Sequence, residues 1–432
     1  MEATLTWCRT RQLIPVLSIV ALLEGCAEEK ADPKYKVDAS AASAGDGGAA
    51  ATGDSGGSAT GDGGASAATF KAFDDALDKA IAAYNDSEPG AAAPILGASA
   101  VLVHKTKGTL HSKGYGEFAA DRLYLIASAS KILSVGVLMK LADEGKVDFD
   151  TPISEYLTDW DAHKTNVTLA QLFSNSSGLP ALSEILAVSS NPTPEALAQY
   201  TPHFCQYMGA GTLTDCGKAI YQDENPGNNR EPDVEFRYGG SQWQLAGAVA
   251  EVVSGKSWAE LIDETYVEPC GVPSLGFTNP FGQQGVSPLG YPAFDADKAN
   301  LPESDNPSIE GGAYVTAPDY AKLLQMQMNG GKCGTKQVLS AEAVERMQTD
   351  RVTAYGGTAT TGGIDSLFTG YGMGWWVGDE FIADPGAYGA FPWIDDSGEY
   401  GAMIIIEVSS GVGGQLAIAT KPAVDAIMAK LK

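Results

Sequence analysis

One stretch of the chain, Tyr124–Gly145 (YLIASASKILSVGVLMKLADEG), combines a helix pattern with a reactive pair of side chains. Apolar residues recur at helical spacing after Lys131, and Gly145 stands where a glycine commonly ends a helix. If the helix begins at or just before Ser128, the Ser128 hydroxyl and the Lys131 amine project from one face of its first turn. The stretch therefore predicts a nucleophile beside a candidate base.

The pair alone does not establish catalysis. A serine hydroxyl is a weak nucleophile until a neighbouring group takes its proton, and a lysine can take it only when its pKa is lowered. Ser-x-x-Lys also occurs by chance on solvated helix faces. Other motifs must therefore support the catalytic interpretation.

Composition excludes one class of partner. The chain has 432 residues, 44% of them hydrophobic, which is enough for a large soluble enzyme. Its formal net charge is -26, so its surface should repel nucleic acid and anionic lipid headgroups. Because no Cys-x-x-Cys or His-Glu-x-x-His spacing occurs, no metal or other cofactor is predicted.

The N-terminal residues predict export. The apolar run Leu13–Leu23 is too short to span a bilayer but suits a secretory signal. It leads to Leu23-Glu24-Gly25-Cys26, which resembles a bacterial lipoprotein signal. This resemblance implies a signal peptide over residues 1–25, a lipid on Cys26 and a place in the cell envelope, with Ala27 favouring the outer membrane. A plain secretory signal is the alternative.

Residues 26–69 are predicted to be a disordered tether. Ala39–Thr69 is almost entirely Ala, Gly, Ser, Thr and Asp, which cannot fill a core. Within it, Gly53–Gly57 matches the nucleophile-elbow pattern Gly-x-Ser-x-Gly, but no strand precedes it and no helix follows it. We therefore reject that match and expect the folded domain over residues 70–432.

Within that domain, strands are predicted near both ends and helices between them. This order predicts one sheet built from residues 70–127 and 310–432, an inserted helical domain over 128–309, and a cleft between the two. Ser183–Pro232 is expected to be an irregular cap. The expected helices are Phe70–Asn85, Ser128–Gly145, Gln242–Ser254, one from Ala317 and Ala423–Leu431; the expected strands are Gly97–His104, Thr109–Tyr115, Gly374–Val377, Ala387–Asp395 and Tyr400–Ser409.

Four cysteines remain outside the signal region, namely Cys205, Cys216, Cys270 and Cys333. An even number in an exported chain predicts disulfides. Three pairings exist, and proximity in sequence favours Cys205 with Cys216 and Cys270 with Cys333.

Six segments together resemble a known family. They are IASASK (Ile126–Lys131), LADEGKVDFDTPISEYL (Leu141–Leu157), VTLAQLFSNSSGLP (Val167–Pro180), FRYGGSQWQLAGAVAEVVSG (Phe236–Gly255), EGGAYVTAPDYAKLLQMQMNGG (Glu310–Gly331) and YGMGWWV (Tyr371–Val377). Their order is similar to that of the serine β-lactamase and penicillin-binding protein superfamily, in the branch of class C β-lactamases, DD-peptidases and related esterases. The resemblance implies an α/β (α+β) fold with an antiparallel sheet flanked by the N- and C-terminal helices.

The resemblance also implies site roles. Ser128 would be acylated with Lys131 as its partner, and the second motif, Tyr-x-Asn, falls on Tyr238-Gly239-Gly240. Tyr238 keeps the phenol, whereas Gly240 replaces an asparagine that would position the lysine and bind a substrate amide. Whether Lys131 or Tyr238 takes the serine proton stays open, because the two would titrate as a coupled pair.

The third motif aligns with Asp384-Pro385-Gly386, where the family usually has a cation. Gly386 is kept, and the backbone amides of Ala387 and Ser128 would form an oxyanion hole. In a cleft, Asp384 should repel substrate carboxylates, which favours neutral esters or amides over β-lactams and cell-wall peptides.

The sequence thus predicts a lipid-anchored serine hydrolase that acts on a small ester or amide. The alternative is a non-catalytic envelope binding protein that keeps the fold. A Ser-His-Asp hydrolase is disfavoured, because none of the four histidines, His104, His111, His163 and His203, accompanies a credible nucleophile elbow.

Overall fold

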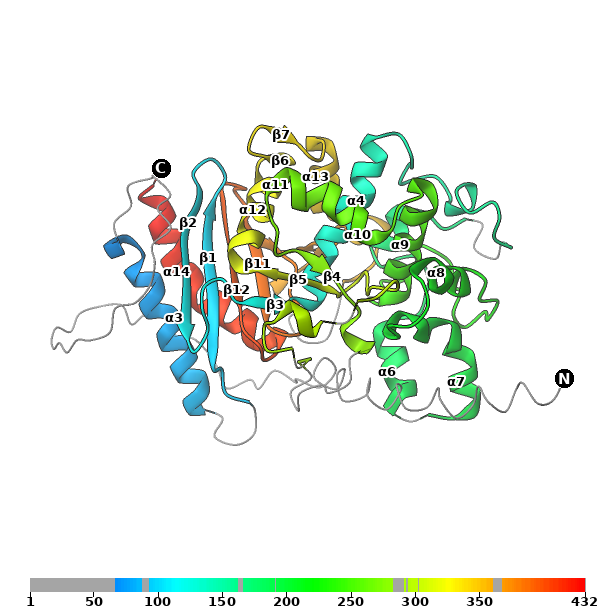
Figure 1. Cartoon of the computed structure of the whole chain (residues 1–432), viewed down its shortest axis with the longest axis horizontal. Coiled ribbons are helices and arrows are strands. Elements are labelled where there is room, and N and C mark those ends of the chain that lie inside the picture. Colours follow the sequence, from blue (N-terminus) through cyan, green and yellow to red (C-terminus); the bar gives the residue numbers. More distant parts are fainter. Residues whose placement is uncertain are drawn as a thin grey trace.

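The computed structural model describes residues 67–87, 93–161, 166–190, 192–282, 291–292, 294–301, 303–359 and 367–431 (Figure 1). The predicted signal peptide, Cys26 and nearly all of the predicted tether lie outside these residues. No helix in the described ranges has both the length and the apolar composition of a membrane span.

A seven-stranded antiparallel sheet joins the two ends of the folded chain. In spatial order its strands are β2 (Gly108–Gly116), β1 (Gly97–His104), β12 (Tyr400–Ile405), β11 (Ala390–Asp395), β10 (Phe381–Ala383), β9 (Trp376–Val377) and β8 (Gly370–Tyr371). An early strand therefore pairs with a late one, so that Val101 of β1 lies opposite Met403 of β12. This arrangement confirms the predicted fold class.

The two faces of the sheet carry different cores. Ala98, Ala100 and Leu102 of β1 pack in the core shared with the N-terminal helix α3 (Ala67–Ser87) and the C-terminal helix α14 (Ser410–Ala429). Val101 and Val103 belong to the core on the opposite face, because side chains alternate along a strand. Figure 1 shows α3 and α14 together on one side of the sheet and the other helices on the far side.

The chain between β2 and β8 is mainly helical, and it also forms a small sheet of β3, β5 and β4 and a hairpin of two short strands. The elements are β3 (Leu123–Leu125), α4 (Lys131–Asp143), α5 (Leu169–Phe173), α6 (Leu182–Ser190), α7 (Pro194–Tyr200), α8 (Leu213–Tyr221), α9 (Gly240–Ser254), α10 (Trp258–Ile262), α11 (Glu268–Cys270), β4 (Gly276–Phe277), β5 (Ala313–Thr316), α12 (Ala317–Met328), β6 (Lys332–Cys333), β7 (Lys336–Gln337) and α13 (Ala341–Gln348). Helices α4 and α9 are apolar on nearly all sides and lie in the main core, as such helices must.

Two sequence-based expectations are wrong. Ser183–Pro232 is not irregular, because it contains most of α6 and all of α7 and α8. Threonines cap the latter two: the Thr193 and Thr212 hydroxyls accept backbone N–H groups at their first turns. Helix α14 begins at Ser410 rather than Ala423, since packing onto the sheet offsets the low helix propensity of its glycines and of Pro422.

Both expected disulfides are present. Cys205 bonds to Cys216 and Cys270 bonds to Cys333. The first joins a 3₁₀ turn, Thr201–Tyr207, to α8, and the second joins α11 to β6. The pairing predicted from proximity in sequence is therefore confirmed.

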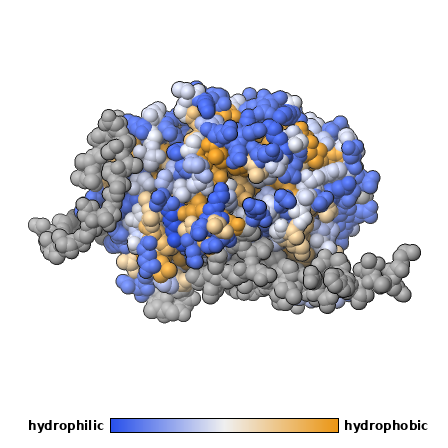
Figure 2. All heavy atoms as spheres, viewed as in Figure 1, coloured by the Kyte–Doolittle hydropathy of each residue, from blue (hydrophilic) through white to orange (hydrophobic). Residues whose placement is uncertain are grey.

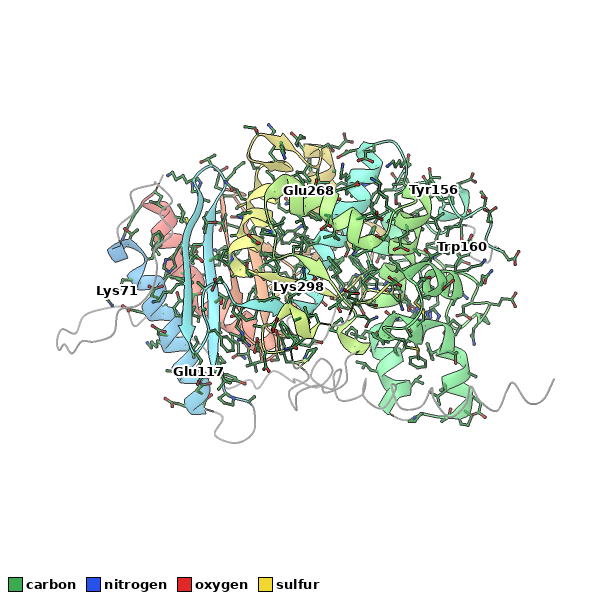
Figure 3. All side chains as sticks on the ribbon, in the orientation of Figure 1. Lys71, Glu117, Tyr156, Trp160, Glu268 and Lys298 are labelled. Carbon is green, nitrogen blue, oxygen red and sulfur yellow. A yellow bond between two sulfur atoms is a disulfide. The ribbon has the colours of Figure 1, made fainter. Side chains whose placement is uncertain are left out.

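The visible surface of the molecule is mainly hydrophilic. Figure 2 shows hydrophilic residues over most of the visible face, interrupted by smaller hydrophobic areas. Lys71 of α3, labelled in Figure 3, is typical of the hydrophilic positions, with 71% of its side chain exposed.

Candidate active site

Ser128 lies in a strained turn between β3 and α4. Residues Ala127–Ser130 form a 3₁₀ turn, and Ala127 has φ +45°, a left-handed conformation that residues with a Cβ seldom adopt. The turn is held from both sides, because the Ile126 amide donates to the Ala313 carbonyl (3.1 Å) and the Ser130 hydroxyl donates to the Ala127 carbonyl (2.6 Å). Its other residues are buried, whereas Ser128 is partly exposed.

Lys131 lies beside this serine with its side chain fully buried. Its ammonium group donates to Ser128 Oγ at 3.0 Å and to the Glu310 backbone carbonyl at 3.1 Å. The structure therefore brings together the two side chains that the spacing placed on one face of a turn, although Ser128 precedes the α-helix proper.

Tyr238 approaches the same pair from a distant part of the chain. Its ring centroid lies 4.6 Å from Lys131 Nζ, and its side chain is within hydrogen-bonding reach of both Lys131 and Ser128. Its backbone carbonyl accepts the Leu182 amide at 2.7 Å, which anchors the segment before α9. The three residues Ser128, Lys131 and Tyr238 thus form one cluster.

The charges in the cluster favour a protonated lysine. Burial alone would lower the pKa of Lys131, but Tyr238, Glu310 and Asp384 outweigh it and raise that pKa above its ordinary value. Burial also raises the pKa of the Tyr238 phenol, an effect that Lys131 only partly offsets. The cluster therefore holds an ammonium group and a neutral phenol near neutral pH.

Gly240 lies at the start of α9, where the resemblance implies an asparagine. A Cβ at Gly240 would lie 2.0 Å from Gln206 Oε1 and 2.1 Å from Glu310 Oε1, far inside contact distance. Two side chains from other parts of the chain therefore occupy the place of the missing one. The sequence reasoning did not identify Gln206 or Glu310 as site residues.

Asp384 does not face the cleft. Its side chain is completely buried, and its Oδ2 accepts the backbone amide of Ile132 at 3.3 Å, at the N-terminus of α4. Burial raises the pKa of this carboxyl group well above its ordinary value. The expectation that Asp384 lines the cleft and meets the substrate is therefore corrected, because its side chain is completely buried and bonded at a helix terminus.

The effect of Asp384→Asn on the stability of the protein should depend on pH. Because the folded-state pKa of Asp384 is raised, its stabilisation is complete below the unfolded value of about 3.9 and is lost as pH rises through the folded value. Asparagine does not titrate, so the stability of the variant relative to wild type should increase from pH 5 to pH 9. At pH 5 the free energies of unfolding of the two proteins should differ by no more than about 1 kcal/mol. Calorimetry at several pH values checks this. If the stability of the variant relative to wild type falls as pH rises, the pKa of Asp384 is not raised in the folded protein.

Gly386 allows the turn after β10 to touch the turn that contains Ser128. A Cβ at this position would lie 2.0 Å from the Ile126 carbonyl oxygen, so no larger residue fits without a shift. The next residue, Ala387, packs in the same apolar cluster as Ala127. Its backbone is thereby held beside the turn that contains Ser128.

A chain of buried polar groups lies behind Gly240. Ser241 Oγ is 2.9 Å from His203 Nδ1, and His203 Nε2 is 2.9 Å from Asp223 Oδ2. The order resembles a hydrolytic Ser-His-Asp triad, but Ser241 is only 1% exposed and its hydroxyl also accepts Gln206 Nε2 at 2.9 Å. We therefore assign this chain of polar groups a supporting role.

Nowhere in the described ranges do three or more His, Cys, Asp or Glu side chains gather in a way that could hold a metal ion.

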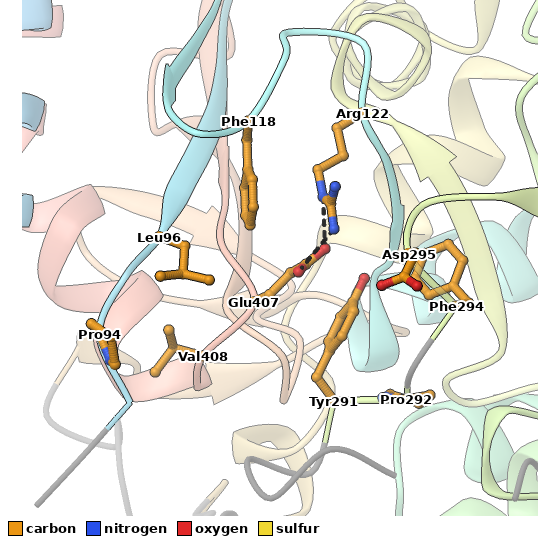
Figure 4. A pocket seen from close by; sticks show the side chains of 10 residues that line it. All are labelled: Pro94, Leu96, Phe118, Arg122, Tyr291, Pro292, Phe294, Asp295, Glu407 and Val408. Atoms are coloured by element: carbon orange, nitrogen blue, oxygen red, sulfur yellow. Dashed lines mark hydrogen bonds and ion pairs between the residues drawn. The ribbon is translucent and has the colours of Figure 1, made fainter. Parts of the chain in front are cut away.

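The described chain also forms a cavity of about 210 Å³ (Figure 4). Its walls combine apolar side chains with Arg122 and Glu407, which form a paired contact at 2.9 and 3.1 Å. Tyr291 links the cavity to the nucleophile segment, since its hydroxyl accepts the Leu125 amide at 3.1 Å and its ring lies 5.2 Å from that of Tyr388. The lining residues are Pro94, Leu96, Phe118, Arg122, Tyr291, Pro292, Phe294, Asp295, Glu407 and Val408.

Comparison with known proteins agrees with this geometry. The family model described as Beta-lactamase matches residues 77–423. Penicillin-binding protein 4 of Amycolatopsis lactamdurans is 24% identical over 327 residues, covering 70% of this chain and 75% of that protein. Other curated relatives are matched over about half of their length, 46%.

Solved structures share the fold. EstCE1, described as a hydrolase with promiscuous acyltransferase activity, superimposes with a TM-score of 0.63 at 16% identity over 83% of this chain and all of that one. The D-amino acid amidase from Ochrobactrum anthropi SV3, solved with L-phenylalanine amide, gives a TM-score of 0.60 at 17% identity over 83% and 99% of the two chains.

Proposed function

The chain belongs to the beta-lactamase family, and from this premise we propose that it is a serine hydrolase that forms an acyl-enzyme on Ser128. The observation that carries the proposal is the 3.0 Å contact between Lys131 Nζ and Ser128 Oγ, with Tyr238 within reach of both. A partly exposed hydroxyl beside a buried lysine and a partly buried tyrosine is an arrangement suited to acyl transfer.

In the first half-reaction, Ser128 Oγ attacks the carbonyl carbon of the substrate as its proton leaves toward the Lys131–Tyr238 pair. The backbone amides of Ser128 and Ala387 stabilise the oxyanion; the close approach of Gly386 to the Ile126 carbonyl supports this pairing. The leaving group then takes a proton and departs, and water releases the acyl group as a carboxylic acid.

Neutral esters and amides are the proposed substrates, for a different reason than the sequence indicated. The cation that contacts Ser128 is Lys131, and the Glu310 carboxylate already balances its charge. Asp384, at the position where the family usually has a cation, is completely buried. A substrate carboxylate would therefore lack a partner at either place. The descriptions of EstCE1 as a hydrolase and of the Ochrobactrum protein as an amidase are consistent with this class.

The same proposal includes a lipid anchor on Cys26 that holds the enzyme in the bacterial envelope. This part is supported by the sequence alone, namely the apolar run Leu13–Leu23 followed closely by Cys26. A surface that repels anionic headgroups would then depend on the lipid for membrane attachment.

Intact-mass spectrometry of the full-length protein tests both parts. After incubation with a fluorophosphonate, or with p-nitrophenyl esters and a penicillin in parallel, we expect one added group on the peptide that contains Ser128, formed fastest with the neutral esters. The N-terminal peptide should begin at Cys26 and carry lipid mass. A folded protein that gains no adduct from any reagent would instead indicate a ligand-binding protein.

A further inference from the structure

Glu310 and Gln206 occupy the place of an absent side chain beside Lys131. Each offers a carboxylate or amide oxygen about 2 Å from the point where a Gly240 Cβ would be. Both residues are more than nine-tenths buried, and no partner is recorded for Gln206 Oε1 within the described part of the chain. The pair therefore takes the position of the asparagine rather than leaving it vacant.

Gln206 is held in one orientation. Its Nε2 donates to the His203 carbonyl at 2.8 Å and to Ser241 Oγ at 2.9 Å, which uses both amide hydrogens. Ser241 and His203 are in turn bonded to each other, and His203 contacts Asp223. The amide oxygen of Gln206 must therefore face Gly240 and Glu310.

Glu310 continues the line of contacts from the nucleophile. Lys131 Nζ lies 3.0 Å from Ser128 Oγ and 3.4 Å from Glu310 Oε2, and it also donates to the Glu310 backbone carbonyl. The side chains of Lys131 and Glu310 are 0% and 9% exposed, so little water competes for these contacts. The lysine thus bridges the serine hydroxyl and a carboxylate.

We propose that Glu310 acts through Lys131 as the final acceptor of the Ser128 proton, and that with Gln206 it replaces the asparagine that would position the lysine. The proposal rests on the acyl transfer proposed above. It makes Glu310 a positioning and relay residue, since it contacts the lysine rather than the substrate.

The relay balances at each step. As the bond from Ser128 Oγ to the carbonyl carbon forms, the hydroxyl proton passes to Lys131 Nζ, and Lys131 passes another proton to Glu310 Oε2. The carbonyl electron pair moves to the oxyanion, Lys131 stays an ammonium group and Glu310 becomes a neutral acid. When the tetrahedral intermediate collapses, Lys131 protonates the leaving group and regains a proton from Glu310.

Three other titratable side chains surround the Lys131–Glu310 pair, namely Tyr238, Tyr371 and Asp384. Burial raises the pKa of both phenols, so they stay protonated near neutral pH, and it also raises the pKa of the Asp384 carboxyl group. Since the pKa of Lys131 is also raised, a neutral lysine is scarce there.

The pH dependence of the acylation rate tests the relay. In wild type the rate should be level around neutral pH, because an acceptor for the Ser128 proton is already in place. In Glu310→Gln, Lys131 must lose its proton first, so the rate at pH 7 should fall at least about 100-fold and then rise about tenfold per pH unit toward alkaline pH. Glu310→Asp should keep the wild-type shape at a lower rate.

The control is Glu251→Gln, a partly buried carboxylate on α9 that bonds to Thr214 and the Trp258 amide, away from the cluster. It should keep the wild-type pH profile. An unchanged profile in Glu310→Gln, at whatever rate, would overturn the relay. Failure of wild-type Ser128 to become acylated would instead overturn the proposed function.

A swap of residues tests the replacement of the asparagine. Gly240→Asn alone should slow acylation at least about tenfold, because its Cβ would collide with Gln206 Oε1 and Glu310 Oε1. Adding both Gln206→Ala and Glu310→Ala removes the two collisions, so the triple variant should be faster than Gly240→Asn, with the rising pH profile of Glu310→Gln. A Gly240→Asn protein as active as wild type would contradict the replacement.

Discussion

Ser128→Ala should abolish turnover of a p-nitrophenyl ester, by at least about 10³-fold in kcat/KM, without unfolding the protein. The reason is that no other serine or threonine hydroxyl in the described ranges is recorded as bonded to the buried Lys131 ammonium group, and Ser128 is partly exposed. The lost contact is one hydrogen bond, so stability should change by only about 1 kcal/mol. Steady-state kinetics and thermal unfolding measure the two effects.

Ser134→Ala is the matched control. Ser134 lies on the same helix, is completely buried and donates to the Ile309 carbonyl at 2.6 Å. Its removal should cost about 1–2 kcal/mol of stability, because it leaves that carbonyl unsatisfied, yet the Ser128 adduct should still form. Full activity in Ser128→Ala, or an adduct on the peptide that contains Ser241, would contradict the assignment of the nucleophile.

Lys131→Met should combine a loss of activity of at least about 10³-fold with a loss of stability of about 3–5 kcal/mol. The activity falls because Ser128 loses its bonded proton-transfer group. The stability falls because the Glu310 carboxylate, only 9% exposed, loses its counter-ion. Urea unfolding measured beside the kinetics separates the two.

The stability effect is tested by a double-mutant cycle. Adding Glu310→Gln to Lys131→Met removes the unpaired charge and should recover most of the stability but none of the activity. Lys140→Met, which breaks an exposed pair with Glu144 on the same helix, should cost no more than about 1 kcal/mol. Equal stability losses in the two lysine variants would show that Lys131 and Glu310 do not form a buried ion pair.

Much of the fold could be predicted from local pattern. The strands Gly97–His104 and Tyr400–Ile405 and the helix ending at Gly145 follow from hydrophobic spacing and a glycine that takes φ +73°. The late start predicted for α14 shows the limit of such reasoning. The low helix propensity of Gly413 and Pro422 disfavours a helix there. Propensity does not include the free energy gained when Leu416 and Val424 pack onto the seven-stranded sheet.

The candidate site also contains residues that the sequence could identify and residues that it could not. Ser128, Lys131 and Tyr238 could be named because their motifs are short and local. Glu310 could not, although it stands in a segment used for the family resemblance, because its role depends on a lysine 179 residues away. A signal was present: Glu310 is a charged residue directly before Gly311-Gly312 and an otherwise apolar strand.

By itself the sequence predicted Ser128 and Lys131 on one face of a turn, the two disulfides and a sheet built from both chain ends, because motif spacing, the order of the cysteines and hydrophobic pattern can all be read along the chain. Only the tertiary structure decided that the Asp384 side chain is buried against the N-terminus of α4 and that Gln206 and Glu310 fill the place left by Gly240. Burial and charge pairing set those outcomes, and both depend on which distant segments meet, which no local pattern encodes.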